Sequence, residues 1–247
     1  MTGSGTNGDA DRPRIDVVLP VHEEAAIIER VLDEAYEEFS RHVVPRFIVC
    51  EGGSRDGTRD VLETLSRRLP IALRSHADRR SYSAAVIEGL QAAETELVLV
   101  MDADGQCDPR DLRGFLGASP GVDVVVGQRV PRRDPAARRL LSFGFRVLHR
   151  VLFGPTVRDP SCPFVLLRRA AITPLLPAMG FLPTGFWWEL AAVAKSAGRA
   201  VREVPTHHRE RFGGSSRAIR YRDLPRLVRT HVAGLVRLRL SRGGRPH

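Results

Sequence analysis

The sequence is most informative at first for what it lacks. Its 247 residues contain no apolar run of roughly 18 residues, so no membrane-spanning helix is expected. It has three cysteines, Cys50, Cys107 and Cys162, and no Cys-x-x-Cys pair, which argues against a disulfide framework or a zinc site. We expect these thiols to be packing residues in a reduced, cytosolic setting. Residues 1–14 lack the apolar core of a secretory signal, and we expect them to form a disordered leader.

Two common nucleotide-binding motifs are also missing. No Gly-x-Gly-x-x-Gly follows the first expected strand, and no Gly-Lys-Ser/Thr loop occurs, which disfavours dinucleotide dehydrogenases and P-loop NTPases. The first half nevertheless alternates strand and helix patterns, which predicts an α/β fold with a mostly parallel central sheet flanked by helices. Strands are expected over 15–20, 46–50, 71–74, 97–101, 122–127, 164–167 and 201–207, and helices over 23–39, 58–69, 81–93, 138–153 and 186–197.

The end of the chain contains almost no acidic residues. From Arg217 onward nine arginines face one acid, Asp223, so this part holds nearly all of the net charge of +9. Apolar residues recur at helical spacing over 223–241, which predicts a basic amphipathic helix within the segment 217–247. Such a helix suits an anionic membrane surface, although packing against the domain is an equal alternative. Nucleic acid is disfavoured as a partner because no stacking aromatic residue occurs from Asp223 onward.

The segment 97–106 carries the clearest chemical signal. Five apolar residues, 97–101, read as a buried strand, and the carboxylates of Asp102 and Asp104 follow it directly. Ligands of open α/β sheets bind at the carboxyl ends of the strands. Two carboxylates this close repel each other unless a cation lies between them, and Mg²⁺ usually brings substrate phosphates with it. The pattern therefore indicates a metal-bridged phosphate site, with a solvated turn as the alternative.

Six motifs in order along 15–239 resemble one family. They are Leu19-Pro-Val-His-Glu-Glu24, Glu51-Gly-Gly-Ser-Arg-Asp-Gly-Thr58, Asp102-Ala-Asp-Gly-Gln106, Val126-Gly-Gln-Arg129, Arg158-Asp-Pro-Ser-Cys-Pro-Phe164 and Glu203-Val-Pro-Thr-His-His-Arg209 with Gly214-Ser-Ser-Arg217. Together they resemble family-2-type inverting glycosyltransferases of the GT-A fold, in the dolichol/polyprenol phosphate mannosyltransferase-like branch. The resemblance implies one GT-A domain over 15–216.

The same resemblance implies roles for particular residues in binding a nucleotide-diphosphate sugar. Pro20, His22 and Glu24 are expected in the nucleoside pocket, where Glu51 replaces the family's usual aspartate. Asp102, Asp104 and Gln106 are expected to hold Mg²⁺ or Mn²⁺ against the diphosphate, where a metal neutralises the departing group.

The acceptor determines whether a general base is needed. A phosphate acceptor is already anionic and needs cations that position it, for which the resemblance points to Arg129, Arg138 and Ser142. Arg209 and Arg211 are expected to close over the diphosphate.

The favoured function is transfer of a hexose from GDP-mannose or a UDP-sugar to polyprenyl phosphate by a cytoplasmic protein on the inner face of the membrane. The alternative is a soluble hydroxyl acceptor with Glu189 as the base.

Overall fold

The computed structural model describes residues 12–130, 136–213 and 224–243, with backbone only for 136–139, 224 and 242–243. Most of the expected leader 1–14 and the segment 217–223 lie outside these residues. The expected domain boundary at 216 also falls there and stays a prediction.

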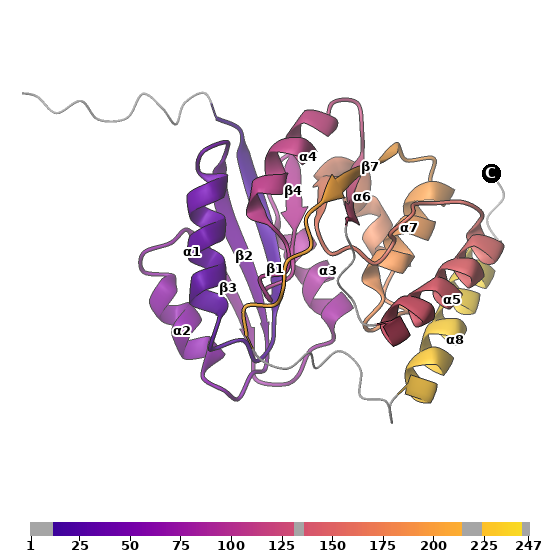
Figure 1. Ribbon diagram of the computed structural model, residues 1–247, viewed down its shortest axis with the longest axis horizontal. Helices are drawn as coiled ribbons and strands as arrows, with labels where there is room; N and C mark the ends of the chain where they lie inside the picture. Colours follow the sequence, from indigo (N-terminus) through magenta and orange to yellow (C-terminus); the bar gives the residue numbers. More distant parts are fainter. Residues whose placement is uncertain (1–11, 131–135, 214–223, 244–247) are drawn as a thin grey trace, which may run out of the picture.

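A seven-stranded sheet forms the centre of the molecule (Figure 1), in the order β3-β2-β1-β4-β6-β5-β7. Only β6 is antiparallel to its neighbours β4 and β5, so the other strands all run in one direction. The strands are β1 (Arg14–Val21), β2 (Val44–Gly52), β3 (Ile71–His76), β4 (Leu97–Val100), β5 (Val124–Arg129), β6 (Val165–Arg168) and β7 (Val201–Thr206). Pro205 is tolerated in β7 because this is an edge strand.

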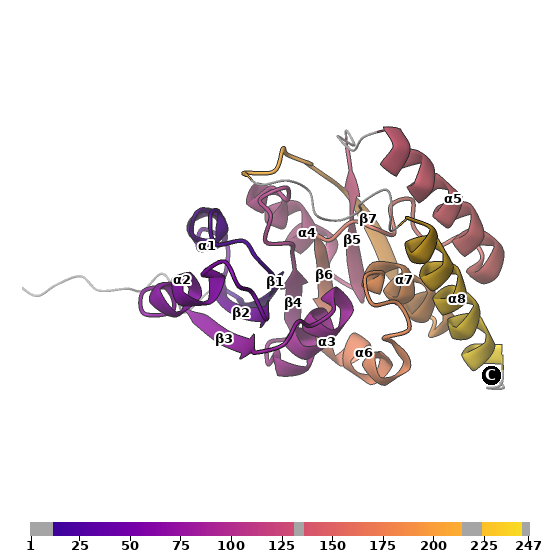
Figure 2. The same cartoon turned by 90° about the horizontal axis from the view of Figure 1, so that it is seen from below.

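Helices cover both faces of the sheet, as Figure 2 shows end-on. One face packs against α1 (Ile28–Phe39), α2 (Thr58–Leu65) and α4 (Leu112–Ala118), and the other against α3 (Tyr82–Ala92), α6 (Arg169–Ile172) and α7 (Phe186–Ser196). Two further helices, α5 (Ala136–Phe153) and α8 (Leu224–Gly243), pack together outside α7. The core residues Phe39, Phe47 and Phe164 are fully buried.

The predicted fold class is confirmed: the molecule is α/β with a mostly parallel sheet, and its last helix is α8. The expected strands and longer helices all occur, with ends that differ by a few residues. The helix expected from residue 23 begins only at Ile28, because residues 22–27 turn over the end of the sheet. The short helices α4 and α6 were not predicted, since seven and four residues are too few to show a period.

Within the described residues, none of the helices combines the length and the apolar character that crossing a bilayer requires. All three cysteines are buried and free of disulfides, as expected. Burial raises the pKa of the Cys50 thiol to about 12, which keeps it protonated and inert.

Candidate active site

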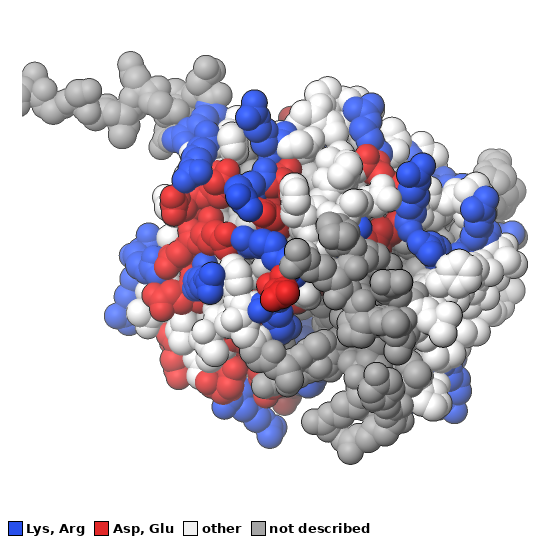
Figure 3. Space-filling view, viewed as in Figure 1, with Lys and Arg blue, Asp and Glu red and all other residues white. Residues whose placement is uncertain are grey.

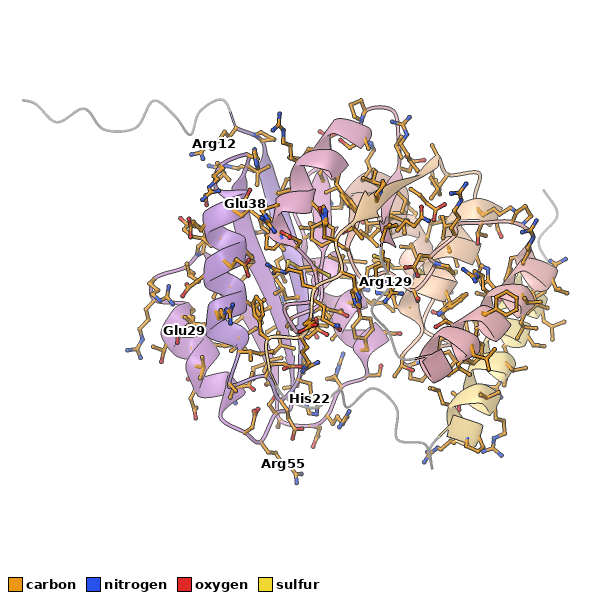
Figure 4. All side chains as sticks on the ribbon, in the orientation of Figure 1. Arg12, His22, Glu29, Glu38, Arg55 and Arg129 are labelled. Atoms are coloured by element: carbon orange, nitrogen blue, oxygen red, sulfur yellow. The ribbon has the colours of Figure 1, made fainter. Side chains whose placement is uncertain are left out.

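The parallel strands end at one edge of the sheet, and most of the predicted site residues are collected there. Glu24 follows β1, Glu51 is the penultimate residue of β2, Asp102 follows β4, Arg129 ends β5 and Arg209 follows β7. In Figure 4, His22 and Arg129 mark the β1/β2 side and the β5/β7 side of this edge. An edge that gathers loops from several parallel strands is where ligands bind in such folds.

Hydrogen bonds join the loops after β1 and β2. The backbone N–H of Glu23 donates to Ser54 Oγ at 2.8 Å, and the N–H of Glu24 donates to Thr58 Oγ1 at 2.9 Å. Glu23 has a φ of 55°, a left-handed conformation that costs energy for a residue other than glycine. These bonds fix the direction of Glu24, and strain held in this way is typical of functional loops.

Glu51 is buried at the end of β2, with 1% of its surface exposed. Its carboxylate accepts hydrogen bonds from Ser54 N–H at 2.6 Å and from Ser75 Oγ at 2.8 Å. Burial alone would raise the pKa of Glu51, but the bonds from Ser54 and Ser75 outweigh it and hold the pKa below its ordinary value. The side chain is therefore an ionised acceptor beside His22, whose charge lowers the pKa further.

The two aspartates after β4 are half-buried and held by different partners. Asp102 Oδ1 accepts from the Tyr82 hydroxyl at 2.7 Å, and Tyr82 in turn accepts from Trp187 Nε1 at 2.9 Å. Asp104 Oδ1 accepts from the backbone N–H of Gln106 at 3.0 Å. Tyr82 was not predicted as a site residue; the available signal was its place at the start of α3, a helix that begins at this same edge.

The chain after β7 returns across the Asp104 loop. Arg209 N–H donates to the Gln106 carbonyl at 2.9 Å, and Phe212 lies against Gly105. Gly105 has a φ of +76°, and a Cβ there would lie 2.5 Å from the Phe212 ring, so only glycine fits. The loop 102–106 is thus pinned between α3 and the segment after β7.

The two arginines of this segment have different partners. Arg211 donates to Glu24 and lies 3.5 Å from Asp104 Oδ2, so it is in contact with two predicted site residues. Burial raises the pKa of Glu24, although the bond and charge of Arg211 oppose this. Arg209 is instead paired with Glu34 of α1 at 2.5 Å and with the Cys107 carbonyl at 3.0 Å. Arg211 therefore lies beside Asp104, whereas the guanidinium of Arg209 is paired with α1, and their expected closure over the diphosphate stays a prediction.

On the β5/β7 side, Arg129 lies at the edge but is already paired. Its guanidinium binds Asp159 through two hydrogen bonds of 2.8 and 2.9 Å and donates to Ser161 Oγ at 2.6 Å. With 8% exposed, this bidentate pair is buried, so Asp159 balances the charge of Arg129. Because its charge is already balanced, Arg129 has a structural role at this edge and holds Asp159 and Ser161 in place.

A cavity of about 500 Å³ opens next to Arg129, between β5 and α5. Arg146, Arg150 and Arg158, which were not predicted as site residues, line it together with the acidic Asp159 and Glu203. Two other residues were predicted to position the acceptor phosphate. Ser142 lies on α5 one turn before Arg146, and the side chain of Arg138 lies outside the described residues. A second, mostly apolar cavity of about 230 Å³ adjoins it and shares Pro155, Thr156 and Val157.

Glu189 is fully buried at the start of α7. Its two carboxylate oxygens accept the backbone N–H of Gly180 at 2.7 Å and of Leu182 at 2.6 Å, so it fastens the preceding loop to the helix. Burial raises the pKa of Glu189, but the enclosed carboxylate reaches no open surface. This geometry favours a structural role for Glu189, holding the loop 180–182 against α7, over a role as general base.

The carboxylates fit a metal that is bound together with a phosphate. Among the described residues no group of three or more His, Cys, Asp or Glu side chains forms a complete cage. Asp102 and Asp104 instead offer a few oxygen ligands in a half-buried position. Mg²⁺ is commonly held by one or two carboxylates and completed by substrate phosphates.

Comparison with known proteins identifies the class. The family model described as glycosyl transferase family 2 matches residues 16–175, and the chain belongs to this family. The mannosyl-3-phosphoglycerate synthase of Rubrobacter xylanophilus superposes with a TM-score of 0.70 at 21% identity, over 95% of this chain and 76% of that chain, which shows the GT-A fold. The chain is thus a member of glycosyl transferase family 2 with the GT-A fold.

The names of individual relatives point to different acceptors. The chain is 27% identical over 211 residues to the undecaprenyl-phosphate 4-deoxy-4-formamido-L-arabinose transferase of Pseudomonas savastanoi, covering 82% of this chain and 60% of the relative. It is 26% identical to the dolichol-phosphate mannosyltransferase of Pyrococcus furiosus, over 83% and 59%. The glucosyl-3-phosphoglycerate synthase of Mycobacterium tuberculosis, solved with Mn²⁺, uridine diphosphate and phosphoglyceric acid, superposes with a TM-score of 0.67 at 25% identity, over 97% and 81%. The chain spans about 60% of the length of the two curated relatives.

Proposed function

We propose that this protein transfers a hexose from a nucleotide-diphosphate sugar to the phosphate of a polyprenyl phosphate, with Mg²⁺ or Mn²⁺ as cofactor. The names of the curated relatives support a lipid-phosphate acceptor, and metal-bound structures of similar fold support the cofactor. Pro20, His22, Glu24 and Glu51 belong to the nucleotide side in this proposal, and Asp102, Asp104 and Gln106 to the metal and diphosphate.

The observation that carries the acceptor assignment is the pair of adjoining cavities. One is lined by Arg146, Arg150 and Arg158, and the other by apolar residues of β5, β6 and α7. A prenyl phosphate has this same division, with an anionic head and an apolar chain. Arginine binds phosphate through two parallel N–H donors, which orients as well as attracts it. The enclosure of Glu189 supports an acceptor that needs no proton removed.

The proposed transfer depends on three sources of positive charge: a bound divalent cation, Arg211 and the arginines of the cavity. When bound, a divalent cation supplies positive charge against the diphosphate that departs. Arg211, held by Glu24 beside Asp104, adds a second positive charge near the same place. The arginines of the cavity hold the acceptor phosphate so that one of its oxygens attacks the anomeric carbon as the bond to the nucleotide diphosphate breaks. This displacement requires correct positioning above all.

The test is a screen of radiolabelled nucleotide sugars with Mn²⁺, with and without polyprenyl phosphate, followed by extraction into organic solvent. Label that enters the organic phase only when the lipid is present supports the proposal. A matched reaction offers 3-phosphoglycerate, an acceptor that the solved structures name. Label that enters only this water-soluble product would establish a soluble phosphorylated acceptor, and label on a neutral hydroxyl would restore Glu189 as a candidate base.

A further inference from the structure

A buried histidine, His149 of α5, forms part of the wall of the basic cavity. Only 1% of its surface is exposed, and its ring centre lies 5.0 Å from that of Phe153 and 5.5 Å from that of Trp188. It is neither one of the expected site residues nor one of the arginines that hold the phosphate. A histidine can change its charge near neutral pH, so this wall can gain or lose a positive charge beside a bound anion.

The hydrogen bonds of the ring determine which nitrogen carries the hydrogen. Nε2 lies 3.0 Å from the backbone carbonyl oxygen of Trp188, which can only accept, so Nε2 is the donor. In the neutral ring Nδ1 is therefore an acceptor, and it lies 3.4 Å from Thr156 Oγ1. Thr156 also lines the cavity. Because its hydroxyl hydrogen points to the ring, Thr156 offers the cavity only lone pairs.

Protonation of His149 reverses the hydrogen bond to Thr156. With a hydrogen on both ring nitrogens, Nδ1 donates to Thr156 Oγ1, and the hydroxyl hydrogen of Thr156 is free to turn into the cavity. The wall then gains a positive charge on the ring and a donor on Thr156. Both changes favour an anion, because anionic phosphate oxygens accept hydrogen bonds and are attracted by positive charge.

The charged groups around the ring are mostly positive. The buried pair of Arg129 and Asp159 is balanced, and Glu203 of β7 is the other acid on the cavity wall, where it accepts the backbone N–H of Arg158 at 2.6 Å. His231 of α8 lies against Phe145 and does not line the cavity. Figure 3 shows blue atoms with a little red between β7 and α5, whereas red and blue alternate over α1 and α2 on the opposite side. The cations near the ring are Arg146 and Arg150 of α5, Arg158 of the loop after it and Lys195 of α7.

This environment keeps His149 neutral until an anion offsets it. Burial lowers the pKa of His149; the bond to the Trp188 carbonyl opposes this, and the charge of Lys195 lowers the pKa further. A dianion among the arginines would bring negative charge close to the ring and favour its protonated form. Binding of a dianion and uptake of a proton by His149 therefore stabilise each other.

We propose that His149, acting through Thr156, makes the cavity selective for a doubly charged phosphate monoester over a singly charged phosphodiester. This inference rests on the proposed function, in which the acceptor is such a monoester. A phosphate monoester carries close to two negative charges at neutral pH. When a sugar joins one of its oxygens, the phosphate becomes a diester and loses one of these charges.

The change of charge during the reaction gives this selectivity its use. The acceptor binds with a proton on His149 and with the Thr156 hydroxyl donating to it. The diester attracts that proton less, so the ring returns to its neutral form and Thr156 again turns its lone pairs to the cavity. His149 is thus a positioning residue that favours binding of the acceptor and release of the product.

The first experiment follows the proton on His149 by nuclear magnetic resonance. The full chain, labelled with ¹³C-histidine, is titrated from about pH 5 to about pH 8 with and without sulfate, an anion that stays doubly charged over this range. The signal of His149 is the one that His149→Gln removes. Sulfate should raise the proton affinity of His149 about tenfold, as a nearby charge of opposite sign does. His42, just before β2, is the control and should titrate alike with and without sulfate.

The second experiment measures the affinity for sulfate by isothermal titration. Linkage requires this affinity to change by the same factor, so it should rise about tenfold as the pH falls through the pKa of His149. His149→Gln should abolish this pH dependence, and His42→Gln, which removes a histidine outside the cavity, should retain it. Arg146→Gln/Arg150→Gln should lose most sulfate binding at every pH, which verifies that the anion is in the cavity.

A third variant, Thr156→Val, removes the hydroxyl without changing the charge. The ratio of the affinity for sulfate to that for dimethyl phosphate, which carries one charge, should fall about fivefold, the effect of one hydrogen bond. Thr64→Val on the surface of α2 is the control and should keep the ratio. Thermal melting verifies that each variant is folded.

Three results would overturn the inference. They are a His149 titration that sulfate leaves unchanged, a pH dependence of sulfate binding that persists in His149→Gln, and sulfate binding that is absent or does not depend on Arg146 and Arg150. An unchanged ratio in Thr156→Val would overturn the part assigned to the hydroxyl. Since sulfate is neither sugar donor nor acceptor, failure here leaves the radiolabel screen unaffected. Failure of that screen, with the proton linkage intact, would leave a dianion site whose natural ligand is not a lipid phosphate.

Discussion

The two sides of the carboxyl edge are built in opposite ways. The side formed by the loops after β1, β2 and β4 carries carboxylates, held by bonds such as Ser54 N–H to Glu51 and Gln106 N–H to Asp104 that span two or three residues. The side around β5 and α5 carries arginines, and its cavity collects residues from 128 to 203. A site that must receive a metal with a diphosphate uses local carboxylates, whereas an anion-binding site can be assembled from long cationic side chains on distant elements.

The largest effect is expected from Asp104→Asn. If the metal and diphosphate depend on the carboxylates, turnover should fall about 10²- to 10³-fold, because an amide removes charge where charge develops. Sugar transfer with saturating Mn²⁺ measures this, with circular dichroism to verify the fold. Asp60→Asn on the surface of α2 should leave turnover unchanged. Equal activity of the two variants would remove the metal role of Asp104.

The second largest effect is expected on the side of the edge around β5 and α5. Arg146→Gln/Arg150→Gln should raise the KM for the acceptor about 10- to 100-fold, the range for hydrogen bonds to a charged group. The KM for the nucleotide sugar should change little, since these arginines line only the cavity beside Arg129. Arg113→Gln/Arg202→Gln is a control of equal charge elsewhere on the surface. A rise in both KM values would show that the two sides are not separate.

A smaller effect is expected from Tyr82→Phe, which deletes the hydroxyl that donates to Asp102. Partners that orient a metal-binding carboxylate commonly account for about tenfold in affinity at the lower end of their range. A Mn²⁺ titration followed by electron paramagnetic resonance measures this without turnover. In a Trp188→Phe background, the fluorescence of Trp187, which donates to Tyr82, gives a second readout. Tyr36→Phe is the control, and unchanged Mn²⁺ affinity of Tyr82→Phe would limit that hydroxyl to packing.

The same contrast explains what the sequence could predict. The strands and the loops holding Glu24, Glu51, Asp102 and Asp104 were found because period and motif lie in contiguous residues. The partners of Arg129 and Arg209 were not, since Asp159 and Glu34 are 30 and 175 residues away along the chain. For α5, the sequence predicted a helix over 138–153 but not which of its apolar residues are buried. Leu140, Phe143, Val147 and Val151 are exposed, and this is known only from the structure.

The smallest change in turnover is expected from Glu189→Gln. A glutamine offers one carbonyl oxygen, so its NH₂ group would face either Gly180 N–H or Leu182 N–H, both of which now donate to the carboxylate. Leaving a buried donor unpaired should lower the free energy of unfolding by about 1–3 kcal/mol. Turnover by the folded enzyme should stay near the unmodified value, because the carboxylate is enclosed and touches the loop 180–182. Urea unfolding and sugar transfer on the same preparation separate the two effects, with Glu63→Gln on α2 as the control. Loss of turnover without loss of stability would instead make Glu189 the base and a hydroxyl the acceptor.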